Sequence, residues 1–279
     1  MRRFLSCFRK ALSLALEHDV LNTAKAAAYS GMLMIFPMVV VLTTLMALVP
    51  EGPTLVGEFR SVSEQVLPAE TMSLMQSAIV SKRIRSSQLI FSAGSLSVFA
   101  GLGLMLSLMD GFRRAYRLPR NEWGFWEKRV RGLLLVLIVL VPLALATMLL
   151  VFGHAIEHWM VINADHEMRH VVLFLWRMAR WSIAVATSIT VLAALYHFGT
   201  KRGEHWVHIL PGAAVATLVW FPATLAFGLY VTRIADYSKF YGSFAAGVAT
   251  LVWLYLTSFS ALLGAELNGV LFRERQNQV

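Results

Sequence analysis

Long apolar runs, separated by shorter polar and basic segments, dominate the pattern of the chain. A membrane-spanning helix needs about 20 mostly apolar residues, because the hydrocarbon core is roughly 30 Å thick. Six stretches meet this requirement: Ala26–Val49, Gln88–Met109, Gly132–Gly153, Val171–Phe198, Pro211–Thr232 and Phe244–Asn268. None of them alternates apolar and polar residues with a period of two, so helices rather than strands are predicted. We therefore predict an all-α polytopic membrane protein with six transmembrane helices.

The composition supports this class. The 279 residues are 57% hydrophobic and 15% charged, yet the formal charge is +9. Soluble domains are roughly 45–50% apolar and about 25% charged, so this chain has too few charges to cover a globule. Disorder and a soluble enzyme are both disfavoured, and a single cysteine excludes an internal disulfide.

The distribution of Lys and Arg predicts the orientation. They gather in the N-terminal segment 1–25, the loop 110–131, the connection after the fourth stretch and the tail 269–279. Loops rich in Lys and Arg stay in the cytoplasm, so both termini are predicted to be cytoplasmic. The positive charge of the chain is then mainly a signal of how the six-helix transmembrane domain 26–268 is oriented in the membrane.

Two segments outside the apolar stretches have helical periodicity. In residues 1–25, five apolar side chains fall near one helical face, with three basic ones beside them: Phe4, Leu5, Phe8, Leu12 and Leu16, and Arg2, Arg9 and Lys10. Such an amphipathic helix either lies on the cytoplasmic leaflet as an interfacial helix or packs against the inner end of the bundle, and both interpretations stay open. The outer segment 50–87 predicts short extracytoplasmic helices broken by Pro68.

Charged residues inside the apolar stretches are the first candidates for function. Arg177 and Arg180 lie three residues apart in the fourth stretch and therefore share a helix face. A charge in a span normally faces the bundle interior or water, and guanidinium groups suit phosphate, which predicts a substrate or anion site. The alternative is that both side chains reach the outer headgroups, since they lie near the start of the stretch.

An acid and an amide lie late in the last stretch. Glu266 and Asn268 are predicted to form an intramembrane ion pair or proton relay with a neighbouring helix. Helix-end bonding at the membrane interface is the alternative role for this pair.

Proline and glycine in the stretches indicate helix shape and packing. Pro37 should kink the first stretch, because proline removes a backbone donor. Gly242, Gly247 and Gly264 offer small surfaces where helices approach closely.

One motif points to a metal. His166, Glu167 and His170 form a literal H-E-x-x-H, the zinc pattern of metalloproteases. The motif ends an outer loop instead of lying within a helix, and the third histidine of the longer zinc motif is missing. A solvated histidine-rich loop is the favoured interpretation, so neither a metal nor another cofactor is expected.

The loop 110–131 combines basic and aromatic residues. This mixture is typical of RNA binding and also of a membrane surface rich in anionic lipid. The acids on the predicted cytoplasmic side form no metal-binding motif for nuclease chemistry. Inner-leaflet headgroups are therefore the predicted partners and nucleic acid is not, and the contacting side chains would be Arg113, Arg114, Arg117, Lys128, Arg129 and Arg131.

Several ordered blocks together carry a family resemblance. They are Ala27 to Ser30 before Phe36-Pro37, Gly111-Phe112-Arg113 with Phe125-Trp126, Pro211-Gly212-Ala213 before Trp220, Tyr241-Gly242-Ser243 before Trp253, and Gly264 to Asn268. In this order the chain resembles the YihY/BrkB family of bacterial inner-membrane proteins, over roughly residues 10–270. One departure is His197-Phe198-Gly199 after Tyr196, where the family tends to have a proline-containing turn.

The resemblance implies envelope integrity and virulence-related resistance, with lipid or small-molecule transport as a suspected activity. An older assignment of this family to a tRNA-processing ribonuclease is regarded as mistaken. The expectation is a non-enzymatic transporter or flippase-like protein for a lipid or anionic amphiphile. A scaffold of an envelope complex is the alternative, a membrane-bound hydrolase is the third and disfavoured one, and a homo-oligomer stays open.

Overall fold

The fold is helical throughout the residues that the computed structural model describes, which are 2–46, 86–119, 123–140, 142, 169–201, 204–231 and 245–277. The helices are α1 (Arg2–Glu17), α2 (Val20–Met46), α5 (Ser86–Ala115), α7 (Arg169–Gly199), α8 (Trp206–Leu229) and α10 (Ala245–Gln276). A further helix covers 125–140, and these segments contain no strand. The predicted all-α class is confirmed.

Five of the described helices are long and apolar enough to cross a membrane. The candidate spans are Val20–Val41, Ile90–Ala115, Phe174–Gly199, Trp206–Leu229 and Gly247–Gln276. They match five of the six predicted stretches. The helix at 125–140 covers the start of the remaining stretch, Gly132–Gly153, and most of that stretch lies outside the described residues. The outer segment 50–87 also lies outside them, apart from its last two positions.

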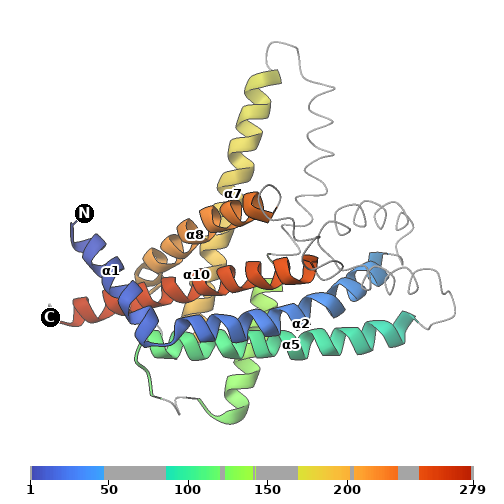
Figure 1. The fold of residues 1–279 in the computed structure, drawn as a ribbon, viewed down its shortest axis with the longest axis horizontal. Helices are drawn as coiled ribbons and strands as arrows, with labels where there is room; N and C mark the ends of the chain where they lie inside the picture. Colours follow the sequence, from blue (N-terminus) through green and yellow to red (C-terminus); the bar gives the residue numbers. More distant parts are fainter. Residues whose placement is uncertain are drawn as a thin grey trace.

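Three helices, α2, α5 and α10, lie side by side and form the main layer of the bundle (Figure 1). Small residues allow the close approach. A Cβ placed on Gly103 of α5 would stand 3.2 Å from the Ser30 hydroxyl oxygen of α2, and one on Gly31 would stand 3.5 Å from Leu254 of α10. Membrane helices use small residues in this way because lipid supplies no hydrophobic force that drives helices together.

The other long helices lie on this layer. The helix α8 packs along α10, and α7 packs on α8 and crosses the layer steeply (Figure 1). Helix α1 contacts the last turns of α10, so the N- and C-termini lie at the same end of the bundle (Figure 1). We call this end, where the termini lie, the terminal end.

Four helices extend beyond their predicted apolar stretches at the terminal end. Helix α5 continues past Met109 to Ala115, and α8 begins at Trp206, five positions before Pro211. Helix α2 begins at Val20, six positions before Ala26, and α10 continues past Asn268 to Gln276. Hydropathy misses these turns because they carry polar residues such as Thr23 and Arg273, whereas packing against neighbouring helices keeps them helical.

Pro37 lies inside α2, where its side chain is buried. It removes the N–H that would bond the carbonyl of Leu33, and α2 is visibly curved (Figure 1). Helix α8 contains two prolines, Pro211 in its second turn and Pro222 further along.

Candidate functional site

Large buried side chains from four helices pack together at the terminal end. Phe112 and Met109 of α5, Tyr196 of α7, Ile209 of α8 and Leu262 of α10 are among the largest side chains with less than 2% exposure. The Phe112 and Tyr196 rings meet edge to face with centroids 5.1 Å apart. Several helices therefore converge here on a small volume, and the polar groups inside it form the candidate site.

Helices α8 and α10 touch backbone to backbone through two glycines. A Cβ on Gly264 would run into the carbonyl oxygen of Gly212 and the hydroxyl of Tyr196. A Cβ on Gly212 would in turn meet the carbonyl oxygen of Gly264. The Tyr196 hydroxyl donates to the carbonyl oxygen of Ala261 at 2.6 Å, which fixes α7 at the same crossing. Only glycine fits at both positions.

Asn268 links α10 to the first turns of α8. Its Oδ1 accepts a hydrogen bond from the backbone N–H of Gly212 at 2.8 Å, and its Nδ2 donates to the carbonyl oxygen of Ile209 at 2.9 Å. Asn268 is 1% exposed, so both ends of its amide are satisfied inside the protein. The predicted polar role of Asn268 is therefore a helix-to-helix contact with the backbone of α8 beside Pro211.

Glu266 is the fully buried acid of the site. Its Oε1 lies 2.8 Å from Nδ1 of His18, which is in the corner between α1 and α2. Its Oε2 is buried and has no hydrogen-bond partner among the residues that the structure describes. Burying a carboxylate is unfavourable unless it is paired and hydrogen-bonded. The burial of Oε2 without such a partner therefore lowers the stability of the protein.

The corner that presents His18 has an unusual backbone. Asp19 adopts a φ of 57°, a left-handed conformation that ordinary residues rarely take. Its carbonyl oxygen accepts from the Thr23 N–H at 3.1 Å, and its Oδ1 accepts from Asn22 Nδ2 at 2.7 Å. Asp is one of the few residue types that tolerate this conformation, and here it turns the chain directly from α1 into α2.

Helix α5 ends beside Glu266 in a second left-handed residue, Arg117, with a φ of 53°. The N–H of Leu118 bonds the carbonyl of Arg113 at 2.9 Å, and that of Arg117 bonds the carbonyl of Arg114 at 3.0 Å. These two bonds define a Schellman motif, in which glycine is the usual residue at the left-handed position. The termination of α5 alone therefore does not explain why an arginine occupies this position.

Arg273 completes the charged group around Glu266. Its Nη1 donates to the carbonyl oxygen of Ala115 at 3.3 Å, where it caps the last turn of α5. Its Nη2 is buried without a hydrogen-bond partner among the described residues. The positive charges of Arg273 and Arg117 both act on Glu266. We call His18, Arg117, Glu266 and Arg273 the inner polar cluster.

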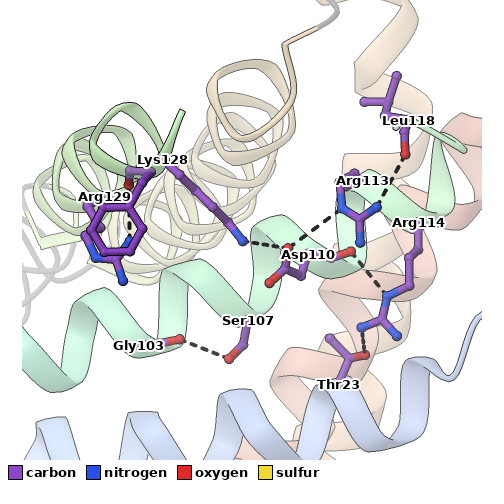
Figure 2. Close-up of polar contacts among 10 residues, drawn as sticks. Thr23, Gly103, Ser107, Asp110, Arg113, Arg114, Leu118, Lys128 and Arg129 are labelled. Atoms are coloured by element: carbon purple, nitrogen blue, oxygen red, sulfur yellow. Dashed lines mark hydrogen bonds and ion pairs between the residues drawn. The ribbon is translucent and has the colours of Figure 1, made fainter. Parts of the chain in front are cut away.

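A second set of polar contacts surrounds Asp110 near the end of α5 (Figure 2). Lys128 Nζ lies 2.7 Å from Asp110 Oδ1, and Arg113 Nε lies 3.8 Å from the same oxygen. Arg114 donates to the Thr23 hydroxyl of α2 at 2.6 Å (Figure 2). Asp110 thus joins α5 to the helix 125–140, and Arg114 joins α5 to α2.

Two further basic residues of the loop stack on aromatic rings. The Arg129 guanidinium carbon lies 3.5 Å from the centroid of Phe125, and that of Arg131 lies 3.8 Å from the centroid of Trp123. Phe125 and Trp126 are 64% and 75% exposed. Large exposed aromatic rings beside cations are typical of a membrane interface.

The other predicted site residues divide into described and undescribed positions. The backbones of Arg177 and Arg180 lie in the first half of α7, and their side chains are outside the described set, as is that of His170. Gly242, His166 and Glu167 also lie outside the described residues, whereas Gly247 is buried in α10. No group of three or more His, Cys, Asp or Glu able to hold a metal occurs in the described part of the chain.

Sequence reasoning missed two members of the inner polar cluster, His18 and Arg273, and it assigned Arg117 to lipid headgroups. His18 lies 248 positions before Glu266, and no local pattern connects the two. A signal did exist for Gly212, because it belongs to the block Pro211-Gly212-Ala213 that follows a basic, histidine-rich connection.

Five long apolar helices, joined by basic and aromatic residues at one end, define a multi-pass helical membrane protein. A family model described as virulence factor BrkB matches residues 11–279. The chain belongs to this family.

Curated relatives point the same way. The chain is 25% identical to a ribonuclease-like protein, YfkH, of Bacillus subtilis (strain 168), over 98% of this chain and 97% of the relative. It is 27% identical to a UPF0761 membrane protein of Chromohalobacter salexigens, over 99% of this chain and 66% of the relative. A UPF0761 membrane protein of Aromatoleum aromaticum is 26% identical over 90% of this chain and 60% of that relative. The chain thus spans less than two thirds of the two longer relatives, and no solved structure matches.

Proposed function

We propose that this protein is a transporter of an anionic amphiphile, of the phospholipid class, in a bacterial inner membrane. The observation that carries the proposal is the state of Glu266, a fully buried acid at the convergence of α10, α5 and the α1–α2 corner, one oxygen of which has no hydrogen-bond partner among the described residues. A static bundle would be as stable or more stable with an apolar residue there. A half-satisfied buried charge fits a contact that must break and re-form.

The terminal end has the properties of a closed gate. Gly212 and Gly264 bring α8 and α10 into backbone contact, and Tyr196 and Asn268 bond across that contact. The inner polar cluster closes the same end on the side of α1 and α5. Opening the gate would break these polar contacts and separate the glycines that bring α8 and α10 together.

Arg177 and Arg180 are proposed to bind the anionic group of the substrate. They lie on α7, whose other end contributes Tyr196 to the closed end. Sixteen residues separate Arg180 from Tyr196, about 24 Å along a helix, which is most of the thickness of the hydrocarbon core. Substrate binding and gating would therefore occupy opposite halves of one helix.

The proposed orientation places the terminal end, with both termini, in the cytoplasm. Lys and Arg concentrate there, which supports this orientation. The predicted contact with anionic headgroups is retained for Arg117, which is exposed. The other five basic residues already bond to protein groups, which reduces their availability to lipid or RNA; they are Arg113, Arg114, Lys128, Arg129 and Arg131.

Reconstituted protein tests the proposal. Sealed liposomes would contain the purified protein and a fluorescent anionic phospholipid, whose transfer between leaflets is read by bleaching with dithionite. Wild type should accelerate transfer, and Arg177→Ala and Arg180→Ala should each slow it by about 10-fold or more, since each loses a charge-assisted bond to phosphate. Ser182→Ala, at an exposed polar position of the same helix, is the matched control and should match wild type.

The alternative function, a scaffold of an envelope complex, predicts the opposite outcome. Folded wild type would then move neither zwitterionic nor anionic lipid faster than protein-free liposomes. If Arg177→Ala and Arg180→Ala transferred lipid as fast as wild type, the protein would still be a transporter, but the two arginines would not be its anion-binding site.

A further inference from the structure

Helix α1 has three distinct faces. One face packs on α10, where Cys7, Ala11 and Leu14 contact Leu267 and Val270. This contact corresponds to one of the two interpretations left open for the N-terminal segment, the one in which the helix packs against the end of the bundle. The contact with α10 uses only part of the helix surface, and the other two faces are apolar and basic.

The second face is an apolar stripe made of Leu5, Leu12 and Leu16, which we call the leucine stripe. These side chains are 64%, 46% and 65% exposed. They lie at positions i, i+7 and i+11, which places them within about 40° of one another on a helix with 3.6 residues per turn. Three aligned leucines left in water lose the free energy that their burial would provide.

The third face, between the other two, is basic. Arg9 and Lys10 are exposed there. Arg9 lies one turn after Leu5, at the border of the stripe, and Lys10 lies about 100° further around the helix, toward the α10 contact. The helix also contains Arg2 and Arg3, and Glu17 is its single acid. Cations beside an apolar stripe match the two parts of an anionic lipid, its headgroup and its acyl chains.

The connection to α2 determines what can reach this surface. A two-residue corner, His18 and Asp19, separates α1 from the candidate span that begins at Val20. The leucine stripe ends at Leu16, four positions before that span. It therefore lies at the membrane surface of the terminal end, within reach of lipid.

We propose that the leucine stripe of α1 inserts into the anionic leaflet at the terminal end, with Arg9 and Lys10 on the phosphate groups. The helix then binds two surfaces at once, the lipid through the stripe and α10 through Cys7, Ala11 and Leu14. This anchoring holds the corner that presents His18 to Glu266. The inference does not depend on transport activity.

Site-specific fluorescence in the full-length reconstituted protein tests the proposal. In a Cys7→Ser background, Leu12→Cys and Ser13→Cys would each carry an environment-sensitive NBD probe. Both positions are exposed, and they point about 100° apart around the helix, so Ser13 is the matched control. The probe at position 12 should emit at shorter wavelength, be quenched by nitroxide lipids and resist iodide. The probe at position 13 should be quenched by iodide.

Lipid composition tests the charge part of the proposal. Changing Arg9 and Lys10 together to Gln should weaken insertion of the position-12 probe about fivefold per lost cation in phosphatidylglycerol vesicles, and much less in phosphatidylcholine vesicles. Equal iodide quenching at positions 12 and 13 would overturn the proposal. So would a position-12 probe shielded from both iodide and nitroxide lipid, because a protein surface such as a second copy would then cover the stripe. Insertion that ignores the anionic lipid content would overturn the assignment to an anionic leaflet.

Discussion

Gly264 and Gly212 are required by the contact in which they lie. A side chain at either position would meet the backbone of the facing helix, which cannot move aside as a flexible side-chain tip can. The predicted packing role of Gly264 is thereby given a specific partner, although the sequence pattern could not identify Gly212 as that partner.

Gly264→Ala should lower the stability of the protein by about 1–3 kcal/mol, because the added methyl group overpacks the α8–α10 crossing. Thermal unfolding in detergent measures the effect. Gly228→Ala in α8 is the matched control, since a Cβ there meets nothing within 4 Å. That control should be neutral or stabilising by up to about 1 kcal/mol, as alanine favours a helix over glycine. Equal unfolding temperatures for Gly264→Ala and wild type would contradict the backbone contact.

The pair His18 and Glu266 should behave as one unit. His18→Ala leaves a buried carboxylate without its partner and should destabilise the protein by about 3–5 kcal/mol. Glu266→Gln removes the charge and should be milder. The double variant should be clearly more stable than the sum of the single effects predicts, with a coupling of about 1–3 kcal/mol. Additive effects in the double-mutant cycle would show that the two side chains do not interact.

A change at Arg117 should raise stability and slow transport at the same time. Glycine is favoured over other residues at a φ of 53°, so Arg117→Gly should stabilise the end of α5 by about 1 kcal/mol. The same change removes a positive charge that acts on Glu266 and should slow lipid transfer in liposomes. A stabilised variant with the wild-type transfer rate would remove Arg117 from the proposed mechanism.

At the scale of elements, the reactivity of the Cys7 sulfur reports whether α1 is docked on α10. The Cys7 thiol donates to Glu274 Oε2 at 3.1 Å, and Cys7 is 2% exposed. Burial raises the pKa of the Cys7 thiol, and the hydrogen bond and negative charge of Glu274 raise that pKa further. The thiolate, which is the reactive form, is therefore scarce at neutral pH while α1 remains docked.

Cys7 should accordingly react slowly with a maleimide in the folded protein and rapidly after unfolding. Leu14→Glu places a charge in the α1–α10 contact and should increase the labelling rate toward the unfolded value. Because Cys7 is the single cysteine, labelling reports on α1 alone. Rapid labelling of folded wild type would contradict the docked position. Ser13→Glu, at an exposed position outside both the leucine stripe and the α10 contact, is the control that should leave the rate unchanged.

Elements also show where sequence reasoning succeeds and where it ends. Hydropathy predicts α7 to within two residues at each end, since that helix is long and apolar. It begins α2 at Ala26 and ends α10 at Asn268, and so omits the polar turns that carry Thr23 and Arg273. Those omitted turns, with the preceding corner at His18, hold much of the candidate site, because polar groups that interact across a bundle lie at its ends.

At the scale of the whole molecule, the membrane class follows from composition and the family from a match over residues 11–279. The pairing of His18 with Glu266 could not be predicted, because it depends on how helices far apart in the sequence meet. Arg177 and Arg180 show the reverse situation. Sequence identifies them as charges inside a span, and their role in binding an anion remains a prediction.

The central claim is transport of an anionic amphiphile, and the most direct test compares two headgroups in one assay. Purified protein in sealed liposomes would receive fluorescent phosphatidylglycerol or phosphatidylcholine with identical acyl chains. The account predicts transfer of both above the protein-free rate, with phosphatidylglycerol faster by about 10-fold, because the choline cation of phosphatidylcholine weakens the attraction of its phosphate to the two arginines. Folded protein that moves neither lipid would contradict the account.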